Sequence, residues 1–338
     1  MRPRVAAVLL AVLLLPAPAL TAPASREARP DPARLPVFPS YVPRVHEGVV
    51  ALRVRAAEDA PSSSRLGVQR AGSGLVFDAR GYAVTVSYLL LDAVSIEART
   101  RDGRALTARV AALDLDTGLG VVQLEGGAPW PTVTLGDSRD ARPGMLTGTV
   151  GADDDNELVW VTGALQAVRP FSANWEYMLD RALILAPASP SWGGSAVVDD
   201  RGRVIGIASL RLGAPPHVNL AIPIEKFVAV KDELIADGRV VSRRPRPWLG
   251  LYTANVKGAV VVDGFSETGP AGRAGFQKGD RIIRVDGVGV RSQEEFYERL
   301  WRRQAGDVVE VVVVRDEVVH VIGVRSVDRH RLFTRPAR

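Results

Sequence analysis

Cysteine is absent from the 338 residues of this chain, and histidine and lysine are scarce. Without cysteine the chain can form neither disulfide bonds nor thiolate metal sites, so disulfide scaffolds and thiolate-bound metals are excluded. The fold must be held by burial alone. A hydrophobic share of 46% in a chain of this length supplies material for two or three cores. We expect neither a metal nor another cofactor.

Long hydrophobic runs are also lacking, with one short run near the N-terminus. Two arginines precede the run Val5 to Leu15, which ends at Pro16 after about eleven residues, well short of the ~20 that span a bilayer. Small residues follow, and cleavage is expected after Ala19 or Ala24. These features predict a signal peptide over residues 1–24. We therefore expect an exported protein, periplasmic or secreted, without a transmembrane anchor after cleavage.

A strong excess of charge of one sign is missing as well. The formal net charge is +5, and basic residues are scattered among acidic ones. Two stretches are locally basic, residues 242–247 and the tail 327–338. A solvated linker and a frayed terminus explain both, so we expect no nucleic-acid partner.

The middle of the chain is rich in short β-type runs separated by turns. Residues 25–44 carry many Pro, Ala and Arg and predict an extended linker. From residue 45 onward, runs such as "VVALRVRA" and "RVIGIASL" recur at even spacing, which predicts an all-β barrel or sandwich. A helix is predicted over 224–238 with Gly238 at its C-cap. The first domain thus covers residues 45–238, and 239–246 form a linker.

Residues 247–326 resemble a PDZ domain in the order and spacing of their segments. The most specific motif is "GPAGRAGFQKGDRIIRVDG", in which Gly275 and Gly279 permit turns with positive φ. A helix is expected from Ser292 to Arg303, followed by two strands. In such domains a peptide pairs as an added strand, and backbone N–H groups hold its terminal carboxylate.

The β region joined to this module resembles the exported trypsin-like proteases of the HtrA family, which includes DegP, DegQ and DegS. Six segments carry the resemblance in order, among them "GSGLVFDARGYAVTVSYLL", "LDLDTGLGVVQLE", "VTLGDSRDARPGMLTGTVG" and "NLAIPI". The resemblance implies a mainly β fold: a two-barrel trypsin-like (chymotrypsin-fold) domain followed by an α+β PDZ domain.

The triad of this family does not appear at the matching positions. Counting along the motifs places the family's histidine at Tyr88, its aspartate at Gly118 and its serine at Trp192. Acyl transfer of this type needs a hydroxyl, an imidazole base and an orienting carboxylate. The glycine that supplies an oxyanion N–H falls on Pro190, which has no N–H.

Two serines near the glycine pair are alternative candidates for the nucleophile. Ser191 and Ser195 lie beside the glycine pair, but using either breaks the tight turn and supplies no histidine. We therefore expect the chain not to be an enzyme. Tyr88 and Trp192 are expected to lie side by side and to fill the former cleft as an aromatic plug.

Three function classes remain open at this stage. The favoured one is an adaptor or regulator that binds C-terminal or unfolded peptides in envelope protein quality control. The alternatives are an active HtrA-type serine endopeptidase, and a holdase-like chaperone or structural subunit. A homo-oligomer such as a trimer, built on aromatic residues such as Phe38 and Tyr41, and assembly with an active relative both stay open.

The peptide site is predicted from the PDZ resemblance. The carboxylate loop would be formed by Leu249, Gly250 and Leu251, and the edge strand would begin at Leu251 and Tyr252. Phe296 and Leu300 lie four residues apart on one helix face, and one of them should line the pocket for the terminal side chain.

Overall fold

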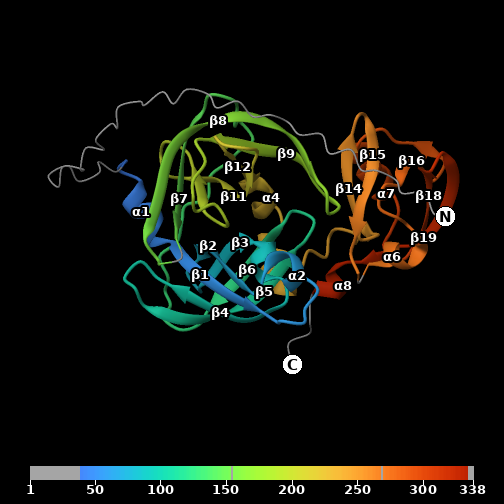
Figure 1. The fold of residues 1–338 in the computed structure, drawn as a ribbon. Helices are drawn as coiled ribbons and strands as arrows, with labels where there is room; N and C mark the ends of the chain where they lie inside the picture. The colour runs from blue at the N-terminus through green and yellow to red at the C-terminus, as the bar shows by residue number, and fades with distance from the viewer. Residues whose placement is uncertain (1–38, 154, 268, 334–338) are drawn as a thin grey trace, which may run out of the picture. The chain divides into compact units, whose positions relative to one another are not determined.

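The computed structural model describes residues 39–153, 155–267 and 269–333. The predicted signal peptide, Phe38 and the first part of the predicted linker lie outside these residues, as do residues 334–338 of the tail. Within the described residues no helix is long and apolar enough to cross a membrane. Two closed β-barrels are followed by a smaller α+β module (Figure 1). The predicted mainly β fold is confirmed.

The first barrel has the strand order β1-β2-β3-β6-β5-β4. Its inward positions carry aliphatic side chains. β1 begins with four consecutive buried residues, because the second barrel also covers the outer face of this strand. The strands are β1 (Val49–Ala56), β2 (Gln69–Asp78), β3 (Tyr82–Val86), β4 (Ala93–Arg99), β5 (Ala105–Asp114) and β6 (Leu119–Leu124), with the short helices α2 (Ser63–Leu66) and α3 (Ser87–Leu90) between them.

The second barrel has the order β10-β11-β12-β9-β8-β7. Its long β8–β9 hairpin reaches beyond the barrel toward the third module (Figure 1). The strands are β7 (Leu146–Ala152), β8 (Leu158–Ala173), β9 (Tyr177–Ala186), β10 (Ala196–Val198), β11 (Val204–Leu212) and β12 (Val218–Pro223).

Small residues allow the two barrels to approach each other closely. Ser73 is fully buried, and its backbone N–H donates to the carbonyl of Gly193 at 2.7 Å. A Cβ on Gly72 would lie 2.4 Å from that carbonyl oxygen. The Gly-Ser-Gly strand and the glycine pair therefore meet at one seam, where larger side chains would clash.

The predicted helix over 224–238 is present as two shorter helices. α4 (Ile224–Val228) and α5 (Lys231–Asp237) are separated because Val230 leaves helical geometry, with φ −130° and ψ −2°. Gly238 ends α5 in the left-handed conformation, as expected for a C-cap.

The linker after α5 is not merely solvated, contrary to expectation. Arg243 forms an ion pair with Asp114, whose side chain is only 2% exposed. Arg246 pairs with Asp116 at 3.5 Å. These pairs fasten the linker to the turn between β5 and β6.

The third module contains a sheet of order β14-β15-β16-β18-β19, with β17 paired to β16. Helix α7 packs on it with a core of its own, and Ser292 caps α7 by accepting from the N–H of Glu295 at 3.2 Å. The elements are β13 (Pro247–Trp248), β14 (Leu251–Val256), β15 (Ala259–Phe265), α6 (Pro270–Ala274), β16 (Arg281–Val285), β17 (Val288–Gly289), α7 (Gln293–Leu300), β18 (Val308–Arg315) and β19 (Val318–Arg325).

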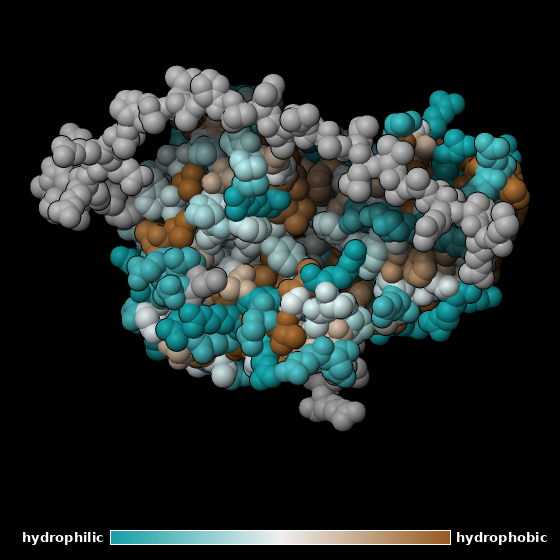
Figure 2. Space-filling model, viewed as in Figure 1, coloured by the Kyte–Doolittle hydropathy of each residue, from teal (hydrophilic) through white to brown (hydrophobic). Residues whose placement is uncertain are grey.

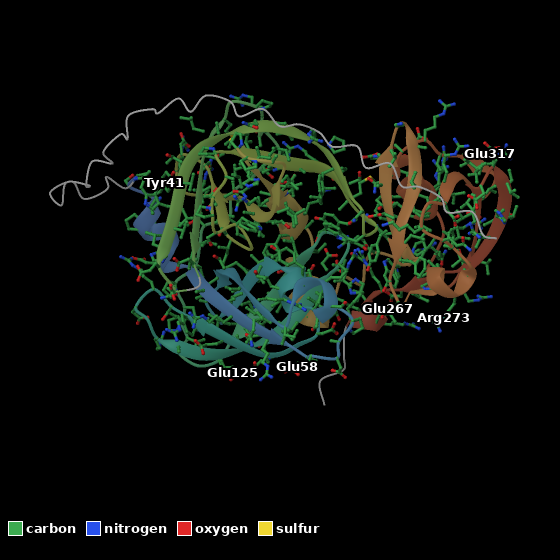
Figure 3. All side chains as sticks on the ribbon, viewed as in Figure 1. Tyr41, Glu58, Glu125, Glu267, Arg273 and Glu317 are labelled. Carbon is green, nitrogen blue, oxygen red and sulfur yellow. The ribbon has the colours of Figure 1, made fainter. Side chains whose placement is uncertain are left out.

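Two segments expected to be loose are ordered. Helix α1 (Val42–Glu47) begins inside the predicted linker, and Tyr41 before it (Figure 3) packs against Gly148 and Gly202 of the same chain. With 9% of its surface exposed, Tyr41 offers little to a trimer contact.

The first part of the basic tail is also structured. β20 (Val327–Asp328) pairs with β13, and α8 (His330–Phe333) follows it. The Phe333 ring lies 6.1 Å from that of Trp248. The expectation of a frayed terminus is therefore wrong for residues 327–333.

Candidate functional site

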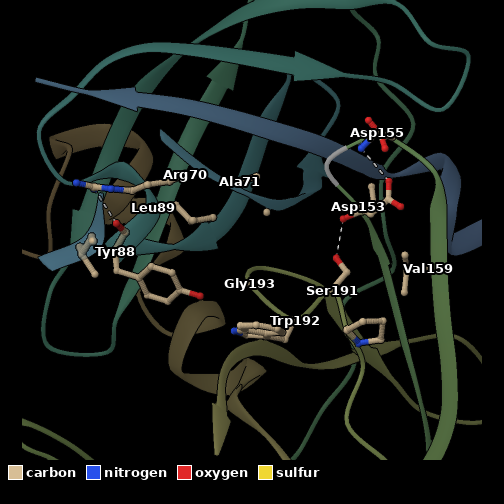
Figure 4. Close-up of a pocket in the computed structure, with 14 residues that line it drawn as sticks. Arg70, Ala71, Tyr88, Leu89, Asp153, Asp155, Val159, Ser191, Trp192 and Gly193 are labelled. Carbon is tan, nitrogen blue, oxygen red and sulfur yellow. Dashed lines mark hydrogen bonds between the residues drawn. The ribbon is translucent and has the colours of Figure 1, made fainter. Parts of the chain in front are cut away.

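A cavity of about 650 Å³ lies between the barrels, where the family motifs meet (Figure 4). Its walls come from β2, α3, the end of β7 and the turn before the glycine pair. The cavity is lined by Leu66, Arg70, Ala71, Gly72, Tyr88, Leu89, Ala152, Asp153, Asp155, Val159, Pro190, Ser191, Trp192 and Gly193.

Tyr88 is held in this cavity by both its backbone and its side chain. The buried guanidinium of Arg70 donates to the carbonyl oxygen of Tyr88 at 2.9 Å, which fixes α3. The Tyr88 hydroxyl donates to the carbonyl of Ser209 at 2.8 Å. Burial raises the pKa of Tyr88 above its ordinary value. The phenol is therefore neutral at physiological pH and acts as a hydrogen-bonding group.

Trp192 lies beside Tyr88 in the wall of this cavity (Figure 4). The Arg211 guanidinium lies 5.6 Å from the centre of the indole ring, within cation–π range. A second cavity of about 590 Å³ lies on the other side and is also lined by Tyr88 and Trp192. The pair therefore separates two open cavities, and the expectation that it fills the cleft is wrong.

Gly118 stands in the turn between β5 and β6 with φ +80°. A Cβ at this position would lie 3.0 Å from the hydroxyl oxygen of Tyr177. That hydroxyl donates to the carbonyl of Thr117 at 2.8 Å. The space into which a side chain from residue 118 would project is thus occupied by Tyr177, from the start of β9.

The serines near the glycine pair differ in accessibility. Ser195 is fully buried and donates to the carbonyl of Ser191 at 2.9 Å. Ser191 is partly exposed, lines the first cavity and donates to the carbonyl of Ala152 at 2.6 Å. Pro190 is exposed at the rim of the same cavity. Ser191 is therefore the hydroxyl nearest to the cleft on this segment.

Histidine does not contribute to the walls of either cavity in the described part of the chain. His46 is buried in α1, where burial lowers its pKa. The ring of His217 contacts the carbonyl of Gly213 in an exposed loop at 2.8 Å. His320 lies on β19 and His330 on α8. Proton transfer in the cleft would have to use a group other than imidazole.

The carboxylate loop predicted in the third module holds a carboxylate from the chain itself. Leu249 and Leu251 donate their backbone N–H groups to the side chain of Glu176, at 3.0 Å and 2.8 Å. Gly250 stands between them with φ +79°. Two N–H groups of the loop thus point at one carboxyl group, and binding of a peptide terminus by this loop stays a prediction.

The other predicted peptide-site residues are placed as follows. Leu249, Leu251, Phe296 and Leu300 are fully buried in the module's core. Tyr252 is partly exposed, and Arg65 of α2 lies 3.6 Å above its ring. Tyr252 also lines the second cavity.

Glu176 itself was missed from the sequence. It stands at the tip of the β8–β9 hairpin, is 1% exposed and adopts φ +55°. Burial raises its pKa to about 7, while the loop N–H groups and Arg329 oppose that rise. The one local signal is that the acidic residue is flanked by the aromatic residues Trp175 and Tyr177. This pattern does not identify a hydrogen-bond partner more than 70 positions away in the sequence.

Comparison with known proteins places both parts of the chain. Residues 72–207 match the trypsin-like peptidase domain, and residues 247–325 match the PDZ domain. The serine endoprotease DegS of Escherichia coli K12 is 27% identical over 274 residues, which cover 76% of each chain. The chain is an HtrA-like protein.

Further relatives agree with this assignment. A probable periplasmic serine endoprotease, DegP-like, of Halomonas elongata is 29% identical over 72% of this chain and 54% of its own length. Two solved structures, each 22% identical, share the fold. The HtrA-type protease AlgW with tripeptide has a TM-score of 0.53 over 85% of this chain and 95% of its own. The serine endoprotease from Yersinia pestis has a TM-score of 0.55 over 87% of this chain and 99% of its own.

The names of these relatives correct one expectation. They are serine endoproteases, which contradicts the expectation that this HtrA-like chain is not an enzyme and points instead to a protease.

Proposed function

We propose that this HtrA-like chain binds the C-terminal ends of polypeptides through its PDZ domain and acts on such proteins in the cell envelope. The observation that carries the proposal is the loop of Leu249 to Leu251, whose N–H groups converge on a carboxylate. A terminal carboxylate offers the same acceptor atoms as Glu176. The name of a periplasmic relative and the predicted signal peptide support the envelope as the location.

The apolar surroundings of the loop favour an apolar terminal residue. Leu249, Leu251, Phe296 and Leu300 supply only aliphatic and aromatic surface. Burying a Val, Leu, Ile or Phe side chain contributes about 1.5–3 kcal/mol, and each strand hydrogen bond about 1 kcal/mol, before ordering costs. These contributions correspond to micromolar affinity.

The test is a titration of the full mature chain with peptides that end in Val or Phe. We expect the free acid to bind in the micromolar range and the amidated peptide to bind much more weakly. Gly250→Ala should weaken the free acid, because φ +79° and a Cβ 3.0 Å from Gly269 both oppose a side chain. Gly258→Ala is the matched control, with φ +76° and nothing within 4 Å. Equal affinity for acid and amide would contradict the proposal.

A second candidate activity, serine endopeptidase, is favoured by the names of the relatives. In the described cleft Ser191 supplies the hydroxyl that this activity would use. The test is release of peptides from unfolded casein by the mature chain, with Ser191→Ala and Ser195→Ala variants. An active endopeptidase that uses Ser191 loses the release in Ser191→Ala alone. Absence of release from the unaltered chain would overturn this activity and leave the binding proposal untouched.

A further inference from the structure

We propose that the tip of the β8–β9 hairpin, residues 173–176, is an internal ligand of the PDZ groove, which a polypeptide C-terminus must displace in order to bind. The Glu176 carboxylate stands in the place of the terminal carboxylate of that polypeptide. The inference rests on the proposed function, because it takes the groove to be the peptide site.

The first argument is the arrangement of donors around Glu176. Its two carboxylate oxygens accept from Leu249 at 3.2 Å and 3.0 Å, and one of them also accepts from Leu251 at 2.8 Å. N–H groups on one tight loop that point at one carboxyl group form a concavity that also suits an anion. A second carboxylate cannot use the same N–H groups while Glu176 accepts from them.

The second argument is the backbone register of the tip. Asn174 lies two residues before Glu176, and its carbonyl accepts from the N–H of Thr253 on the edge strand β14 at 3.0 Å. Thr253 lies two residues after Leu251, the last donor to the carboxylate. An added strand alternates in steps of two residues along an edge strand. The tip therefore takes the first pairing position that an incoming peptide would need.

Further contacts hold the tip from the opposite side of the groove. The hydroxyl of Tyr297, on α7, donates to the carbonyl of Ala173 at 2.6 Å and accepts from the N–H of Glu176 at 3.2 Å. Arg329 donates to the carbonyl of Glu176 at 3.2 Å. Met178, two residues after Glu176, packs against the core of the PDZ module. Polar and apolar groups of the hairpin thus both occupy the groove.

The backbone at the tip is shaped by this docking. Glu176 adopts φ +55°, a conformation that residues other than glycine rarely take. This turn lets the side chain enter the loop while the main chain continues into β9. A conformation of this kind persists where the surroundings over-determine it, and here the surroundings are the PDZ loop, α7 and Arg329.

The test measures binding of a fluorescein-labelled decapeptide that ends in Val to the full mature chain, by fluorescence anisotropy. Glu176→Ala removes the internal carboxylate, so we expect its Kd for the free acid to be at least about tenfold lower than that of the unaltered chain. Glu157→Ala is the matched control, since Glu157 is exposed in the turn before β8 and should leave the Kd unchanged. The amidated decapeptide should gain nothing from Glu176→Ala.

The outcomes separate this inference from the proposed function. Equal Kd values for the unaltered chain and Glu176→Ala, with binding that still requires the free carboxylate, overturn the internal ligand and leave the peptide site standing. Binding that is indifferent to amidation and to Gly250→Ala in both chains overturns the peptide site itself.

A second measurement needs no variant. Hydrogen exchange of the unaltered chain should show faster exchange of the amides of residues 173–177 when the Val-ending peptide is saturating. Unchanged exchange of these amides at saturating peptide would contradict displacement of the hairpin tip.

Discussion

At the scale of single residues, Gly118, to which counting along the motifs assigned the family's aspartate, shows how packing limits the residue at one position. Gly118 has φ +80°, and the Tyr177 hydroxyl lies 3.0 Å from where its Cβ would be. A side chain at residue 118 would therefore meet both an unfavourable backbone conformation and an occupied space. The two costs can be separated, because Gly103 has the same φ with nothing within 4 Å.

We expect Gly103→Ala to lower the free energy of unfolding by about 1–2 kcal/mol, since only the left-handed backbone opposes its Cβ. Gly118→Ala should cost about 1–3 kcal/mol more, because its Cβ also crowds the Tyr177 hydroxyl. In a Tyr177→Phe background the extra cost should shrink. Urea denaturation of Gly103→Ala, Gly118→Ala, Tyr177→Phe and the double variant Gly118→Ala/Tyr177→Phe measures these differences. Equal losses for the two glycine substitutions would show that Tyr177 does not crowd residue 118.

At the scale of elements, the β8–β9 hairpin places the buried side chain of Glu176 against the loop of Leu249 to Leu251 in the PDZ module. The charged and titratable groups that face Glu176 are the Arg329 guanidinium and the Tyr297 hydroxyl. Burial outweighs their effect and that of the N–H donors, so the pKa of Glu176 is raised to about 7 in the folded chain. In the unfolded chain its pKa is about 4.3.

The stability of the chain should therefore depend on pH through Glu176. Between about pH 4.3 and pH 7 the folded chain holds a proton that the unfolded chain has lost. The contribution of Glu176 to the free energy of unfolding is thus present in full below about pH 4.3 and is lost as the pH rises through 7. The free energy of unfolding falls by up to about 1.4 kcal/mol per pH unit in this range.

Glu176→Gln removes this titration. As the pH rises from 5 to 7.5, we expect the unfolding free energy of the unaltered chain to fall relative to that of Glu176→Gln. Parallel stability curves, measured by urea denaturation at each pH, would show that burial does not raise the pKa of Glu176.

The elements that were predictable are those encoded by neighbouring residues. The strands, the start of α7 after Ser292 and the C-cap Gly238 follow from local patterns. The assignment of Tyr88, Gly118 and Trp192 to the triad positions comes from counting along motifs and stays a prediction. The break between α4 and α5 was missed because the apolar pattern continues across Val230.

Contacts between distant segments could not be predicted in the same way. The docking of Glu176 on Leu249 joins residues 73 positions apart, and Arg329 contacts Asp116 across 213 positions. Each contact depends on the placement of whole modules, which no local pattern of charge or hydrophobicity encodes. The basic stretches at the linker and tail were therefore interpreted as solvated, whereas Arg243, Arg246 and Arg329 form ion pairs.

At the scale of the whole molecule, the barrels and the PDZ module have separate hydrophobic cores, which polar contacts and a few apolar ones join. Figure 2 shows the mixed surface of the viewed face. Glu176 docks in the carboxylate loop, and Arg329 reaches from the C-terminal side of the module to Asp116 of the first barrel. Arg65 lies over the ring of Tyr252. Modules with separate cores unfold together only while such contacts couple them.

We therefore expect scanning calorimetry to give one unfolding transition for the unaltered mature chain and two for the double variant Glu176→Ala/Arg329→Ala. The variant loses the carboxylate held by the loop and the guanidinium that contacts both Glu176 and the first barrel. The PDZ module should melt first, because its small core buries a smaller share of its surface than the barrels do. The control Glu157→Ala/Arg331→Ala changes one acid and one arginine at exposed positions and should keep a single transition. Two transitions in the unaltered chain, or one in the double variant, would show that Glu176 and Arg329 do not couple the modules.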